Sequence, residues 1–158
     1  MDRRSLSSAP PLDTDADAVA ARSGVPAPRA PVRILLAAPD RELRRLVALV
    51  LRRDGHYVVE AIDGSSLLEA IASLVIDGAR PFDLIVAAHA IPTISGLSVL
   101  AGLRSRGRRT PFVLMTGNPV VQAQAARLGA VVLDRPFDAA AIRNAVESAH
   151  AQQKEGNA

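Results

Sequence analysis

Few side chains that could do chemistry stand where this sequence pattern would be expected to place them. The stretch from Phe82 to Gly96, FDLIVAAHAIPTISG, reads as a buried strand over Leu84 to Ala88 followed by a loop. In open α/β sheets, ligands and reactive groups gather at the carboxyl ends of parallel strands. This strand end offers Ala87, Ala88 and His89. It therefore predicts almost no catalytic chemistry at the point where chemistry is expected.

His89 is the one titratable group just past this strand, so it is a candidate phosphoacceptor or metal ligand. A lone histidine without a nearby cysteine, histidine or carboxylate cluster is more simply a loop or edge residue. The chain has no cysteine, which excludes disulfides and thiolate metal sites. We therefore predict no metal and no cofactor, and a cytoplasmic location is the simpler interpretation.

Composition fits one compact domain of about 120 to 130 residues with a tail. Apolar residues make up 49% of the 158 residues and aromatics only 3%, so the core must consist mainly of Ala, Val, Leu and Ile. No apolar run approaches the roughly 20 residues that span a bilayer. The formal net charge of +3 is mild and is not typical of a nucleic-acid binder.

The chain divides into three predicted segments. Residues 1–31 are rich in Ser, Ala, Pro and Asp without a sustained apolar period, which predicts a disordered tail. The alternative is that this segment is a short arm that binds a partner. Residues 32–151 carry the alternating strand and helix pattern of a folded domain, and residues 152–158 are predicted to form a disordered end.

Strands and helices alternate through the predicted domain. Five strands alternating with five helices favour a parallel sheet with right-handed crossovers, and the flavodoxin-like strand order 2-1-3-4-5 is the natural doubly wound form. The predicted strands are Val32–Ala37, Tyr57–Ala61, Leu84–Ala88, Pro111–Met115 and Val131–Leu133. The first predicted helix follows Asp40 and ends at Asp54-Gly55. The other four predicted helices cover about Ser65–Ile76, Gly96–Arg104, Val120–Leu128 and Asp138–Ala151.

Four local patterns, in order, carry a family likeness: ILLAAPDRELRRLV, FDLIVAAHAIPTISGLSVL, PFVLMTG and GAVVLDRPFD. From Arg33 to about Glu147 the chain resembles the receiver domain of bacterial two-component response regulators. Working receivers carry an acidic pair after the first strand and a phosphoaccepting Asp at the end of the third, which together bind Mg²⁺. By this resemblance the acidic pair falls on Ala38 and Pro39, and the phosphoacceptor position on Ala88.

None of these three residues can coordinate a cation through its side chain, and Mg²⁺ requires oxygen ligands. Asp40 remains beside the pair, but one carboxylate is too few for the site. The resemblance also places Arg135 at the family's Lys position, Val132 at its switch aromatic and Thr116 at its hydroxyl residue. The degenerate phosphorylation pocket therefore comprises Ala38, Pro39, Asp40, Ala88, Thr116 and Arg135.

Three of these residues have competing interpretations. Asp40 is first of all a helix cap, and the sharper alternative is a salt bridge from Asp40 to Arg135 across the pocket. Thr116 is interpreted as a packing residue whose hydroxyl makes a backbone hydrogen bond. The family often has a cis bond at the position of Arg135-Pro136, which concerns shape rather than chemistry.

We therefore predict a pseudo-receiver: a non-catalytic signalling module that acts through protein contacts without Asp phosphorylation. The alternative is an atypical receiver that is phosphorylated or ligand-regulated through displaced residues. In the family, the usual docking and dimer face is formed by the fourth helix, the fifth strand and the fifth helix, here Val120 to Leu128, Val131 to Leu133 and Asp138 to Ala151. The expected partner is therefore a signalling protein, such as a kinase or an output protein, or a second copy of the chain.

The loop RSRGRRT, with Arg104, Arg106, Arg108 and Arg109, is the densest positive patch. A solvated loop is its simplest interpretation, and an acidic protein or a nucleic acid is the alternative. No aromatic residues interleave with the arginines, which argues against single-strand binding.

Overall fold

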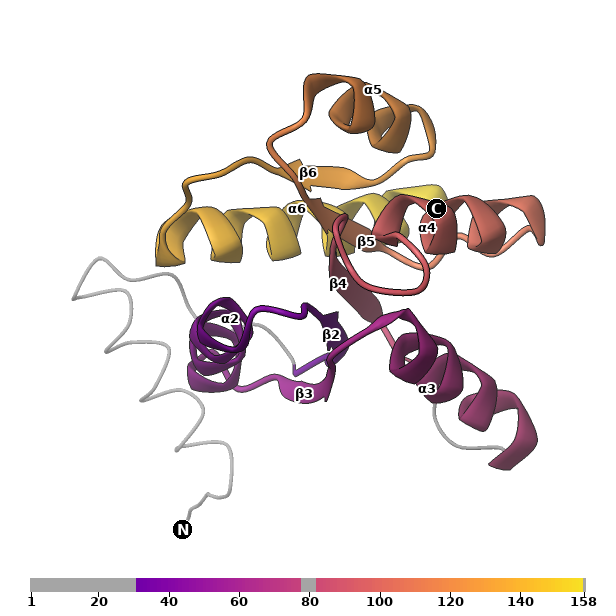
Figure 1. The fold of residues 1–158 in the computed structure, drawn as a ribbon, viewed down its shortest axis with the longest axis horizontal. Coiled ribbons are helices and arrows are strands. Elements are labelled where there is room, and N and C mark those ends of the chain that lie inside the picture. The colour runs from indigo at the N-terminus through magenta and orange to yellow at the C-terminus, as the bar shows by residue number, and fades with distance from the viewer. Residues whose placement is uncertain (1–30, 78–81, 158) are drawn as a thin grey trace, which may run out of the picture. The chain divides into compact units, whose positions relative to one another are not determined.

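The computed structural model describes residues 31–77 and 82–157, and within these residues strands and helices alternate along the chain (Figure 1). The strands are β2 (Arg33–Ala37), β3 (Tyr57–Ala61), β4 (Leu84–Ala88), β5 (Phe112–Met115) and β6 (Val131–Leu133). The helices are α2 (Arg41–Arg53), α3 (Gly64–Asp77), α4 (Gly96–Ser105), α5 (Pro119–Arg127) and α6 (Ala139–Asn157).

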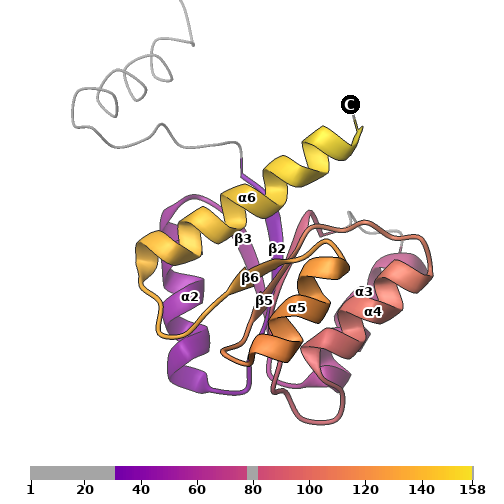
Figure 2. The same ribbon diagram turned by 90° about the horizontal axis from the view of Figure 1, so that it is seen from above.

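The strands form one 5-stranded sheet in the order β3-β2-β4-β5-β6. Every neighbouring pair in this sheet is parallel. Helices α2 and α6 lie on one face, and α3, α4 and α5 lie on the other (Figures 1 and 2). The predicted fold class is therefore confirmed: this is the flavodoxin-like order 2-1-3-4-5, counted from the first strand of the sheet.

The central strand β4 is buried along its whole length, because helices cover the sheet on both faces. Its sequence LIVAA is accordingly apolar throughout and shows no alternation. The edge strand β3 differs, since Tyr57 and Val59 are exposed while Ala61 is buried. The core is aliphatic, as the composition predicted, and Phe112 is among its largest fully buried side chains.

The boundaries of the folded part differ from expectation at one end. Apart from Pro31, the predicted disordered tail lies outside the described residues. At the other end, helix α6 continues to Asn157, beyond Ala151 where we expected an end without structure. The segment 152–157 thus extends the last helix.

Helix α4 begins against the end of β4 through a close backbone approach at Gly96. The Gly96 amide donates to the carbonyl oxygen of His89 over 3.0 Å. A Cβ atom on Gly96 would clash with the carbonyl oxygen of Ala88 and would lie 2.8 Å from the Leu114 Cδ1 atom. Only glycine therefore lets the helix start this close to the strand end. Gly102, in the same helix, is exposed, and a Cβ there would meet nothing within 4 Å.

We predict that Gly96→Ala lowers the free energy of unfolding by about 1 to 3 kcal/mol, because backbone and core atoms would have to move. Gly102→Ala is the matched control and should raise it by about 0.5 to 1 kcal/mol through helix propensity. Urea unfolding followed by circular dichroism measures both variants. Equal effects of the two substitutions would contradict the close-packing explanation.

Candidate functional site

The residues assigned to the phosphorylation pocket gather at the carboxyl edge of the sheet. Ala37 of β2 pairs with Ala87 of β4, so Ala38 and Ala88 lie level with each other just beyond that pair. The next strand brings Thr116 to the same edge, because Met115 pairs with Ala88. The Thr116 amide also donates to Leu133 of β6 over 3.2 Å. The strand register thus brings these residues together as the sequence predicted.

The two central positions of this edge are closed and apolar. Ala38 is 0% exposed and Ala88 is 1% exposed. A buried methyl group cannot bind a cation or accept a phosphoryl group, and a carboxylate at such a position would be costly without a compensating partner. Pro39 and Asp40 are exposed beside them.

Asp40 acts as the cap of helix α2, as its first interpretation predicted. Its Oδ1 atom accepts hydrogen bonds from the amides of Glu42 at 3.0 Å and Leu43 at 3.2 Å. The alternative, a salt bridge from Asp40 to Arg135, is wrong, because no ion pair joins these residues in the described part of the chain. The carboxylate instead accepts hydrogen bonds from amides in the first turn of the helix, which have no partner within the helix.

Thr116 is 7% exposed and holds a turn together. Its Oγ1 atom accepts a hydrogen bond from the Asn118 amide at 3.1 Å. Asn118 in turn caps helix α5 by accepting from the Val120 amide at 2.9 Å. The predicted packing role with a backbone hydrogen bond is therefore confirmed.

Arg135 follows β6 and is exposed. The peptide bond between Arg135 and Pro136 is cis, as the resemblance suggested. Among the described residues, the Arg135 side chain makes no hydrogen bond or ion pair with another residue.

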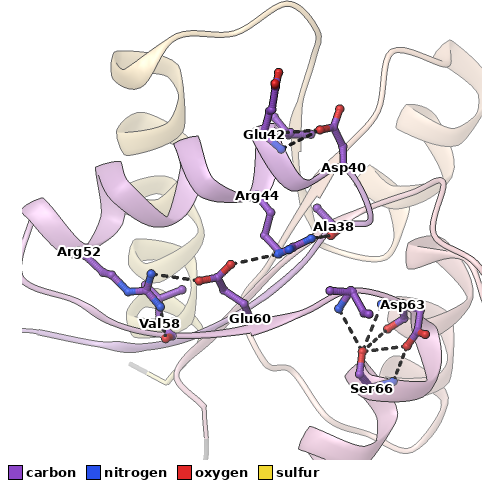
Figure 3. Close-up of polar contacts among 11 residues, drawn as sticks. Ala38, Asp40, Glu42, Arg44, Arg52, Val58, Glu60, Asp63 and Ser66 are labelled. Carbon is purple, nitrogen blue, oxygen red and sulfur yellow. Dashed lines mark hydrogen bonds and ion pairs between the residues drawn. The ribbon is translucent and has the colours of Figure 1, made fainter.

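Arg44 is a residue of this edge that sequence reasoning missed. Its Nη1 atom donates to the carbonyl oxygen of Ala38 at 2.8 Å, and its Nε atom lies 3.0 Å from Glu60 Oε1 (Figure 3). Arg52 completes the cluster, with Nη1 3.1 Å from Glu60 Oε2 and Nη2 3.0 Å from the Val58 carbonyl. Helix α2 is thus tied to the edge strand β3 and to the end of β2. The only signal in the sequence was an acidic Glu60 inside a strand, opposite a helix rich in arginine.

Asp63 is a further carboxylate near this edge, at the start of α3 (Figure 3). Its Oδ1 atom accepts from the Ser66 amide and from Ser66 Oγ, each at 2.8 Å. These hydrogen bonds, the amide first, lower the pKa of Asp63 below its ordinary value. Like the carboxylate of Asp40, that of Asp63 accepts hydrogen bonds in the first turn of a helix.

His89 lies next to Ala88, and its backbone amide donates to Met115 over 3.0 Å. The ring is partly buried, and its Nδ1 atom has no hydrogen-bond partner. Within residues 31–77 and 82–157, no group of three or more His, Cys, Asp or Glu side chains could hold a metal ion. His89 therefore has no neighbouring ligand set.

Comparison with known proteins agrees with this geometry. The family model for the response regulator receiver domain matches residues 34–147. The chain is 36% identical over 110 residues to response regulator MprA of Mycolicibacterium vanbaalenii, which covers 68% of this chain and 45% of that protein. It is also 36% identical over 110 residues to response regulator protein PmrA of Pseudomonas aeruginosa, covering 68% of this chain and 47% of that protein.

Among solved structures, chemotaxis response regulator CheY4 of Vibrio cholerae superposes with a TM-score of 0.63 at 22% identity, covering 76% of this chain and 99% of that one. The chain belongs to the response regulator receiver domain family, whose members are signalling modules. It spans less than half the length of the two curated relatives. None of the described helices is both long and apolar enough to cross a bilayer.

The cap role of Asp40 leads to a testable distinction. Asp40→Ala should lower the free energy of unfolding by about 1 kcal/mol, and Asp40→Asn by only a few tenths, because an amide oxygen also caps a helix. Arg135→Ala should leave stability almost unchanged, since exposed residues away from special features contribute little. Urea unfolding of the three variants checks this. A loss in Asp40→Asn as large as in Asp40→Ala would show that the charge of Asp40 matters.

Proposed function

We propose that this chain is a pseudo-receiver: a signalling module that works through protein contacts and is not switched by phosphorylation of an aspartate. The observation that carries the proposal is the pair of buried alanines at the carboxyl edge of the sheet. Ala88 stands where the family resemblance puts the phosphoacceptor, and Ala38 stands level with it on the neighbouring strand. Both offer methyl groups in place of carboxylates.

The surroundings of Ala38 support the same proposal. The guanidinium of Arg44 lies 2.8 Å from the Ala38 carbonyl oxygen, and its side chain is 13% exposed. This guanidinium is paired with Glu60 and brings no oxygen ligand to the strand end, so it does not favour Mg²⁺ there. Phosphoryl transfer would thereby lose the metal that neutralises its charge. We accordingly propose no metal and no cofactor.

The state of Thr116 fits a domain with one fixed conformation. A hydroxyl that switches in response to phosphorylation needs a phosphoryl group to contact. Here the hydroxyl accepts from the Asn118 amide and so supports the cap of helix α5. In this proposal the edge of the pocket contributes stability rather than a response to an input.

The output surface in this proposal is formed by α5, β6 and α6, which we call the docking face. Strand β6 is an edge strand of 3 residues, with α5 and α6 packed beside it. Val120 at the start of α5 is 67% exposed, and Ala123 and Ala126 are exposed along the same helix. An exposed apolar residue among small ones lets a partner approach closely. We propose a signalling protein or a second copy of the chain as partner, in the cytoplasm.

Phosphorylation assays test the proposal. Incubation of the native chain with acetyl phosphate and Mg²⁺ should give no acyl phosphate by intact mass. The variant Ala38→Asp, Pro39→Asp, Ala88→Asp should gain a hydroxylamine-sensitive phosphate, because it restores the acidic cluster. Mg²⁺ should also raise the melting temperature of this variant and not that of the native chain, since a ligand of the folded state stabilises it.

Several outcomes count against the proposal. An acyl phosphate on the native chain would overturn it in favour of phosphorylation through displaced residues, with Asp40 the first to substitute. Label that disappears in His89→Ala would identify a phosphohistidine instead. A folded triple variant that binds no Mg²⁺ would show that Ala38, Pro39 and Ala88 do not occupy the acidic positions of the family, and the proposal rests on that assignment.

The docking face has its own test. Val120→Glu should abolish retention of the partner in pull-downs from the native organism, because it buries a charge at the interface. Val59→Glu is the matched control, since Val59 is 43% exposed on the opposite edge strand and should leave retention unchanged. Light scattering at several concentrations shows whether the partner is a second copy. Equal loss in both variants would argue against this face.

A further inference from the structure

A hollow of about 420 Å³ lies at the amino ends of the strands, whereas the candidate site lies at their carboxyl ends. Its walls come from the loop that precedes β5, the turn that precedes β6 and the last half of α6. These two connections lie beyond the amino ends of β5 and β6 (Figure 2). Ala88 ends β4 and Thr116 follows β5, so both lie at the carboxyl ends of their strands. The hollow is therefore distinct from the degenerate phosphorylation pocket. Its lining includes Arg104, Arg108, Arg109, Arg127, Leu128 and Gln152.

Arg104 builds the wall of this hollow. Its guanidinium donates to three backbone carbonyls: Leu128 at 2.7 Å, Arg108 at 2.9 Å and Thr110 at 2.9 Å. One side chain thereby joins the two connections that frame the hollow. Burial, and then the charge of Arg109, lower the pKa of Arg104, as expected where cations are crowded without a counterion.

Three further guanidiniums have no partner among the described residues. Arg108, Arg109 and Arg127 are exposed, and none of their side chains forms a hydrogen bond or ion pair there. Among the described residues that line the hollow, none is Asp or Glu. Elsewhere in the described part, arginines such as Arg44, Arg52 and Arg143 are paired with carboxylates. The lining thus concentrates positive charge that no carboxylate in the described part of the chain neutralises.

We propose that this hollow binds a small anion that carries two or more linked phosphate groups. Guanidinium groups bind phosphate oxygens with paired, charge-assisted hydrogen bonds, and several of them here converge from different elements. The volume lies in the range of small-molecule sites. The lining has no aromatic residue on which bases could stack, which disfavours single-stranded nucleic acid.

The test is isothermal titration of the full chain with inorganic tripolyphosphate, repeated at two salt concentrations. Binding should be detected for the native chain. It should weaken about tenfold or more in Arg108→Ala, Arg109→Ala, Arg127→Ala, because charge-assisted hydrogen bonds are lost. The control Arg41→Ala, Arg45→Ala, Arg53→Ala removes the same charge from exposed positions of α2 and should weaken it less than about twofold. Circular dichroism verifies that both variants are folded.

Two additional ligands identify the class of anion. Adenosine triphosphate in place of tripolyphosphate shows whether a nucleoside adds to binding, and either result is consistent with a linked-phosphate site. Absence of tripolyphosphate binding would overturn the proposal, as would an equal loss in the control variant, which would indicate diffuse attraction. Tighter binding of a short DNA duplex, competing with tripolyphosphate, would replace the small ligand by nucleic acid. None of these results depends on whether the chain can be phosphorylated.

Discussion

The burial of β4 is the constraint on which the rest of the structure depends. Helices cover this strand on both faces, so all of its side chains lie in the core. Its last residue, Ala88, meets the start of α4 so closely that position 96 accepts only glycine. A carboxylate at the end of such a strand has to be compensated by a metal or by hydrogen bonds, because an isolated buried charge is costly. An alanine at this position removes that requirement.

The carboxyl edge of the sheet is consequently maintained by local caps and one ion-pair cluster. Asp40, Asp63 and Asn118 each satisfy amides at the beginning of a helix. Arg44 connects the end of β2 with Glu60 on the edge strand. Glu60 is 30% exposed and Arg52 is 48% exposed, so these ion pairs contribute less free energy than the aliphatic core. Its effect is to fix where α2 sits against the sheet.

The carboxyl and amino ends of the strands therefore carry different kinds of side chain. At the carboxyl edge the central positions Ala38 and Ala88 are apolar, Asp40 and Asp63 cap helices, and Arg44 pairs with Glu60. At the amino ends of β5 and β6, arginines line a hollow, and none of the described residues in its lining is acidic. Part of that lining, Arg127 and Gln152, comes from helices that also form the proposed docking face. A ligand held there would contact the elements through which the domain is proposed to bind its partner.

The amino-acid sequence by itself determined the class of fold, the strand order and the position of the family motifs. Apolar runs and caps act over a few residues, so β3, β4 and β6 were predicted with their observed bounds. Strand register then follows from burial, which is why Ala38, Ala88 and Thr116 could be expected to meet. The tertiary structure decided the pairing of long side chains. Asp40 caps its own helix rather than reaching Arg135, and Arg44 binds the Ala38 carbonyl. Arg104 binds the carbonyl of Leu128, 24 residues further along the chain. Such contacts depend on the rotation and spacing of whole helices, which the local sequence pattern does not specify.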